Sequence, residues 1–125
     1  MTENEIAKIV VDCCFKIHTS VGPGLLESVY ETILCKELEK RGLNYERQRG
    51  IDVYYEGLKM GMGFRADIIV EGKVILELKS QEVLAPVHSK QLLTYLKVSG
   101  LKLGLLVNFG DALIKNGIHR IVNNL

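Results

Sequence analysis

Two acidic residues and a lysine in the middle of the chain have the types and spacing of a reactive site. Glu77 and Lys79 are separated by one residue, and Asp67 lies ten positions before Glu77. Side chains alternate between the two faces of a β-strand, so Glu77 and Lys79 point to the same face. Charged groups on an otherwise apolar strand cost free energy unless they are paired, bind a metal or take part in chemistry. The pattern therefore indicates a metal-dependent phosphodiesterase site.

Whether Asp67 joins this site depends on the length of the turn that follows it. A two-residue turn would point Asp67 to the face opposite Glu77. A three-residue turn over 70–72 would pair Asp67 with Ile75 and place it on the face of Glu77. Such turns often have a left-handed third residue, and Gly72 stands there. The alternative is a plain hairpin with Asp67 in solvent and only a surface ion pair on the next strand.

The positions of apolar, glycine and proline residues predict a single α/β domain over 1–125. Apolar residues at helical spacing indicate helices, apolar residues that alternate with polar ones indicate strands, and Gly and Pro mark the ends of both. The resulting order, ααβββαβ, is typical of a mixed β-sheet flanked by α-helices. We expect helices at 3–19, 25–41 and 87–99, strands at 44–56, 58–70, 73–80 and 103–109, and a further edge strand at 118–122.

The second predicted helix supplies a further acidic residue. A helical wheel places Glu27 at the edge of the apolar face, where its carboxylate could complete a metal site, and leaves Glu31 outside that face as a surface charge. The alternative is that Glu27 only stabilises the positive end of the helix dipole. The side chains expected in the apolar face are Leu26, Val29, Tyr30, Ile33, Leu34 and Leu38.

The third predicted helix carries a polar stripe beside its apolar one. His88, Gln91 and Tyr95 follow one another at i, i+3 and i+7. The amide and the hydroxyl could hold a phosphate or orient the lysine. The alternative is that these three residues lie at the edge of the buried face of the helix and that their polar ends reach solvent. Lys90 and Lys97 fall on another side of this helix and are expected to be solvated charges.

Composition limits the classes of partner and compartment. The chain has 16 Lys and Arg against 15 Asp and Glu, so nucleic-acid binding would require a local basic patch. Neither a signal-peptide pattern nor a membrane-length apolar run is found, so we expect no membrane association. Cys13, Cys14 and Cys35 match neither a disulfide framework nor a zinc site, and His18 and His119 lack metal-ligand spacing. We therefore expect a cytoplasmic protein with reduced thiols.

Several motifs, taken in order, resemble one known family. Residues 24–30 read G-x-x-E-x-x-Y, Asp67 is followed by Glu77 and Lys79, and residues 91–95 read Q-x-x-x-Y. Their order and spacing together make the resemblance specific, and it extends over nearly the whole chain. The chain is similar to the GxxExxY family of the PD-(D/E)XK nuclease superfamily. This resemblance implies a restriction-endonuclease-like core, in which a mixed sheet carries the acids and helices flank it.

The resemblance also implies roles for individual residues. Asp67 and Glu77 correspond to the metal ligands of the superfamily, and Lys79 to its catalytic lysine. Glu27 matches the acidic residue that the first core helix contributes to the metal site. Ala66 stands where the superfamily name has proline, but that proline is not a ligand. The residues expected to bind the substrate or support the site are Tyr30, His88, Gln91 and Tyr95.

The expected function is a Mg²⁺-dependent endo- or exonuclease that hydrolyses phosphodiester bonds of DNA, with RNA as the alternative substrate. Mg²⁺ prefers carboxylate and water oxygens, and Mn²⁺ should be able to replace it. The near-neutral charge implies that a homo-oligomer or a partner protein helps to hold the nucleic acid. Two other functions remain open. One is a nuclease-fold module with little turnover that binds nucleic acid or assembles proteins, and the other is a purely structural oligomer.

Overall fold

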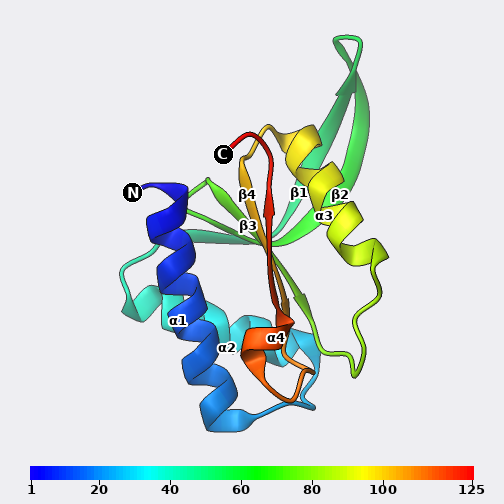
Figure 1. Cartoon of the computed structure of the whole chain (residues 1–125). Helices are drawn as coiled ribbons and strands as arrows, with labels where there is room; N and C mark the ends of the chain where they lie inside the picture. Colours follow the sequence, from blue (N-terminus) through cyan, green and yellow to red (C-terminus); the bar gives the residue numbers. More distant parts are fainter.

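A five-stranded mixed β-sheet with helices on both faces forms the centre of the molecule (Figure 1). The structure is a computed structural model that describes residues 1–125. The elements are α1 (Glu3–Val21), α2 (Glu27–Lys40), β1 (Tyr45–Tyr55), β2 (Leu58–Val70), β3 (Val74–Lys79), α3 (Val87–Ser99), β4 (Leu103–Asn108), α4 (Ile114–Gly117) and β5 (Ile118–Val122). The strands lie in the order β1-β2-β3-β4-β5, and only β3 and β4 run parallel. A parallel pair requires a crossover connection, which α3 provides.

Apolar side chains pack on both faces of this sheet. Leu76 and Leu78 of β3 belong to the cluster that includes α1 and α2, whereas Ile75 belongs to a second cluster with Leu92 and Leu96 of α3. Alternation along the strand explains the division, because odd-numbered positions of β3 face α3. Glu77 is one of these positions. Its carboxylate therefore lies on the face of the sheet that α3 covers.

Most predicted elements agree with the observed ones, and the mixed sheet with flanking helices is confirmed. The strand β2, the helix α3 and the edge strand β5 have the predicted bounds. The prediction that Leu26 and Val29 are buried was wrong, and α2 begins two residues later than expected. Leu26 is the extended residue before the helix and is 74% exposed, and Val29 is 39% exposed. The helix α4 was not predicted, since four residues are too few to show a periodic pattern.

No helix of the structure is both long and apolar enough to cross a membrane.

The turn between β2 and β3 has three residues, as predicted, but lies one position further along the chain. It comprises residues 71–73 rather than 70–72. Val70 is fully buried and therefore remains in the strand. Gly72 has the expected positive φ of 64°, and Glu71 also has a positive φ, 52°. The left-handed conformation thus spans two turn residues instead of one.

The position of this turn decides how the two acids meet. Ile68 pairs with Leu76, and continuing the same register places Asp67 opposite Glu77 instead of opposite Ile75. The partner of Asp67 is thus two residues further along β3 than predicted. Side chains two residues apart on a strand point to the same face, so Asp67 keeps its predicted face. Asp67 and Glu77 are therefore direct cross-strand neighbours rather than diagonal ones.

Gly104→Ala should lower the free energy of unfolding by about 1–3 kcal/mol. A Cβ at Gly104 would lie 2.9 Å from Leu92 Cγ, so α3 packs directly on the backbone of β4. Chemical denaturation measures the loss. In a Leu92→Ala background the added methyl group has room, and the same change should cost less. Equal costs in both backgrounds would contradict this packing.

Candidate active site

Asp67 and Glu77 each accept a hydrogen bond from the backbone of the other strand. The N–H of Leu78 donates to Asp67 Oδ2 at 2.8 Å. The N–H of Asp67 donates to Glu77 Oε2 at 3.2 Å. Both acidic residues are half-buried. The hairpin therefore holds two carboxylates side by side on the α3 face of the sheet.

The surroundings of this pair disfavour the ionised form of Glu77. Burial, the negative charge of Asp67 and a hydrogen bond with Asp67 raise the pKa of Glu77 to about 8. The positive charge of Lys79 and a backbone hydrogen bond from Asp67 oppose this rise only in part. A divalent cation would favour the ionised form of both carboxylates. The two acids thus match the donor chemistry of a hard metal ion.

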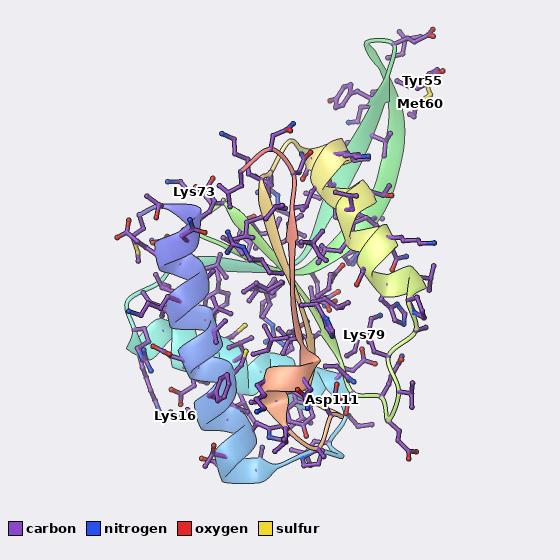
Figure 2. All side chains as sticks on the ribbon, in the orientation of Figure 1. Lys16, Tyr55, Met60, Lys73, Lys79 and Asp111 are labelled. Carbon is purple, nitrogen blue, oxygen red and sulfur yellow. The ribbon has the colours of Figure 1, made fainter.

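Lys79 lies at the end of β3 and, two residues after Glu77, points to the same face. Its ammonium group forms none of the ion pairs of the structure. Its backbone carbonyl accepts a hydrogen bond from Phe109 N at 2.8 Å, which fixes the strand end. Figure 2 shows Lys79 on the side of the sheet where α3 lies. The lysine is therefore available to a ligand of the carboxylate pair.

The polar stripe of α3 reaches the site through one residue. The ring of Tyr95 stacks on Phe64, with the ring centroids 3.9 Å apart and an interplanar angle of 3°. Burial raises the pKa of Tyr95, and the charges of Glu77 and Asp67 add to the effect, so the hydroxyl lies within electrostatic reach of the pair. The side chain of Gln91 is exposed and forms no hydrogen bond within the protein. His88 is half-buried, and its Nδ1 has no hydrogen-bond partner.

Glu27 is not part of the carboxylate cluster. It is the first residue of α2, and its side chain is exposed. No group of three His, Cys, Asp or Glu side chains is close enough to hold a metal ion, so the expected triad of Glu27, Asp67 and Glu77 is not formed. The physical reason is that the first three residues of α2, at 27–29, are exposed, and the helix enters the core only at Tyr30. The start of this helix nevertheless approaches the end of β3, where Ser80 Oγ donates to the carbonyl of Leu25 at 2.6 Å.

Tyr30 supports the structure and has no surface for a substrate. It is fully buried, and its ring stacks on Phe109 with centroids 4.4 Å apart. Its hydroxyl donates to the carbonyl of Gly22 at 2.5 Å and accepts from Leu25 N at 3.2 Å. The tyrosine of the G-x-x-E-x-x-Y motif therefore anchors the loop that precedes α2.

Three polar residues near the site were missed or misjudged in the sequence. Glu31, expected on the surface, is only 7% exposed. Its Oε2 accepts hydrogen bonds from Arg47 Nε at 3.1 Å and from an Arg47 terminal nitrogen at 2.9 Å. Gln48 Nε2 donates to Glu31 Oε1 at 2.8 Å and to Asp67 Oδ1 at 3.3 Å. The wheel put Glu31 just outside the apolar arc of α2, and nothing in the pattern of β1 marked its partners.

The mixed sheet carries two acids and a lysine on the adjacent strands β2 and β3. The model of the PD-(D/E)XK nuclease superfamily matches residues 4–121, and the chain belongs to this superfamily. Membership indicates nuclease activity on nucleic acid, and nucleases of the superfamily generally use divalent metal ions. Neither a curated protein nor a solved structure matches the chain.

The raised pKa of Glu77 predicts a loss of stability with rising pH in metal-free protein. Between its ordinary value of 4.5 and about 8, Glu77 keeps its proton in the folded state and loses it in the unfolded state. The unfolding free energy should therefore fall across this range. Chemical denaturation in the presence of a chelator measures the slope. Glu77→Gln should flatten it, whereas the surface control Glu46→Gln should not. An unchanged slope in Glu77→Gln would contradict the buried, repelled state of this acid.

Proposed function

We propose that this chain is a Mg²⁺-dependent nuclease of the GxxExxY family that hydrolyses phosphodiester bonds of DNA. The observation that carries the proposal is the direct pairing of Asp67 with Glu77, with Lys79 on the same face of the sheet. We infer a single domain over 1–125, since every element of the site comes from one sheet and the helices packed on it.

The donor set supports Mg²⁺ as the ion. Mg²⁺ keeps several water ligands and usually takes only one or two carboxylates from a protein, which Asp67 and Glu77 supply. The pKa of Glu77, about 8, agrees with a site whose anionic form needs a cation. A bound ion would polarise a phosphoryl oxygen and lower the pKa of a water molecule, and Mn²⁺ should substitute for Mg²⁺.

The other residues of the site would act on the phosphate. Lys79 would neutralise the charge that develops on the phosphoryl oxygens or orient the attacking water. Tyr95, near the pair, and Gln91, one turn earlier on α3, would donate hydrogen bonds to the nucleic-acid backbone. His88 is a further candidate, because its Nδ1 has no partner in the protein.

Basic side chains on the same elements support nucleic acid as the substrate. Arg65 lies two residues before Asp67 on β2, and Lys90 and Lys97 lie on α3. All three are exposed and form no ion pair, so they are free to contact phosphates. These positions include Lys90 and Lys97, which were expected only to be solvated charges.

The far end of the β1–β2 hairpin supports a homo-oligomer or a partner protein. This end projects from the body of the molecule, and Figure 2 labels Tyr55 and Met60 on it. Exposed apolar side chains gathered in one place commonly mark a protein interface. The side chains concerned, each more than half exposed, are Tyr54, Tyr55, Leu58, Met60 and Met62.

We also propose a cytoplasmic location. Cys13, Cys14 and Cys35 are all buried and unpaired. Burial raises the pKa of Cys35 to about 11 and that of Cys14 further still, which keeps these thiols protonated and unreactive. Protonated, packed thiols suit a reducing compartment.

One observation favours the second function, a nuclease-fold module that binds nucleic acid with little turnover. Glu27 lies outside the carboxylate pair, so the metal site has two acids instead of three. Glu27 would then act only through water molecules around the ion.

Glu27→Gln should accordingly weaken Mn²⁺ binding, measured by calorimetry, less than Glu77→Gln does. Equal losses in the two variants would place Glu27 among the direct ligands.

Lys79→Ala separates catalysis from metal binding. Nicking of supercoiled plasmid in Mg²⁺ should fall by about 10²–10³-fold, because charge stabilisation in the transition state is lost. The affinity for Mg²⁺ should stay the same or rise slightly, since an ammonium group repels a cation. Calorimetry measures the affinity, and a plasmid assay measures nicking.

Glu77→Ala is the matched variant, and it should lose both metal binding and nicking. Unchanged nicking by Lys79→Ala would rule out a catalytic role for the lysine. Wild-type protein that binds DNA but does not nick it in Mg²⁺ or Mn²⁺ would favour the binding module instead.

A further inference from the structure

Gln48 has a backbone conformation that its place in the sheet does not explain. It lies inside β1 and has a φ of 51°, in the left-handed region. The other non-glycine residues with positive φ lie outside the strands. A non-glycine residue in this region costs about 1 kcal/mol or more and persists where surrounding contacts hold it. The contacts of Gln48 with its surroundings must therefore offset this cost.

Those contacts lead to the carboxylate pair. Arg47 pairs with Ile68 and Arg49 with Ala66, so Gln48 lies opposite Asp67 on the side away from β3. Its amide nitrogen donates to Asp67 Oδ1 at 3.3 Å. The other oxygen of Asp67 accepts from the backbone of β3. Asp67 thus has one hydrogen bond on each oxygen, one from β1 and one from β3, and together these set the plane of its carboxylate.

The amide of Gln48 is itself held from the other side. The same Nε2 donates to Glu31 Oε1 at 2.8 Å. The side chain of Glu31 is 9% exposed, and its second oxygen is occupied by Arg47. Because Arg47 neutralises Glu31, this buried acid serves as an anchor for Gln48 rather than as a competing anion. The chain of contacts runs from α2 through β1 to the site.

We propose that Gln48 is a positioning residue that orients the carboxylate of Asp67 toward a divalent cation. The inference rests on the proposed function, because it assigns Asp67 to the metal. A neutral amide suits the task, since it restrains one oxygen without neutralising the charge that the cation requires. Removing a hydrogen-bond partner of a metal-ligating group typically lowers metal affinity or activity by about 10–100-fold.

Two variants separate the amide from the strained backbone. Gln48→Ala removes the hydrogen bonds and keeps a side chain at positive φ, whereas Gln48→Gly removes the hydrogen bonds and the strain together. Calorimetric titration with Mn²⁺ should show affinity at least about 10-fold below wild type in both variants. Gln48→Gly should nevertheless melt at a higher temperature than Gln48→Ala. If both variants lose the same affinity for Mn²⁺ although their stabilities differ, the loss is caused by removal of the amide.

The control is Glu46→Gln, an exposed residue of the same strand whose ion pair with Arg49 lies on the surface. This variant should bind Mn²⁺ as wild type does. Wild-type affinity in Gln48→Gly would overturn the positioning role and leave the proposed function intact. Wild-type protein that neither binds Mn²⁺ nor cleaves DNA would overturn the proposed function, and the role of Gln48 with it.

Discussion

The site depends on the hydrogen bonds that two adjacent acidic side chains, Asp67 and Glu77, receive from each other's strands. Burial, and after it the negative charge of Asp67, oppose the ionisation of Glu77 and raise its pKa to about 8. Hydrogen bonds from backbone N–H groups to charged acceptors contribute about 1.5–3 kcal/mol each, which offsets part of this cost. The register of one hairpin therefore brings the two carboxyl groups together and holds them in place. A shift by one residue would separate the two acids completely.

The two faces of the sheet bury different amounts of apolar surface. The cluster on the side of α1 and α2 contains 21 buried residues, whereas the cluster beneath α3 contains 7. Hydrophobic stabilisation scales with the apolar area buried, so the larger cluster supplies most of it. The smaller side can therefore hold half-buried acids and a lysine without loss of the fold. The close approach of α3 at Gly104 keeps this thinner layer packed.

Local patterns predicted the elements well because each has a strong period or a clear stop. Gly72 marked the turn, and its lack of a side chain allows the left-handed conformation there without strain. The exact turn residues depended on the burial of Val70, which is a tertiary effect. Glu31 was misjudged for a similar reason, since its burial depends on a cation from a different element. Periodicity describes one element at a time and contains no information on such partners.

The G-x-x-E-x-x-Y motif at the start of α2 has a structural role. Tyr30 anchors the loop before the helix, and Glu31, the next residue, anchors Gln48. Neither contact depends on the exposed acid at position 27 of the same motif. Two locally unfavourable features, the left-handed Gln48 and the repelled Glu77, meet at Asp67. Conflicts with local rules that converge on one residue are typical of a functional site. In the proposed function, α2 would therefore contribute by fixing the orientation of Asp67 through Glu31 and Gln48 rather than by supplying a metal ligand.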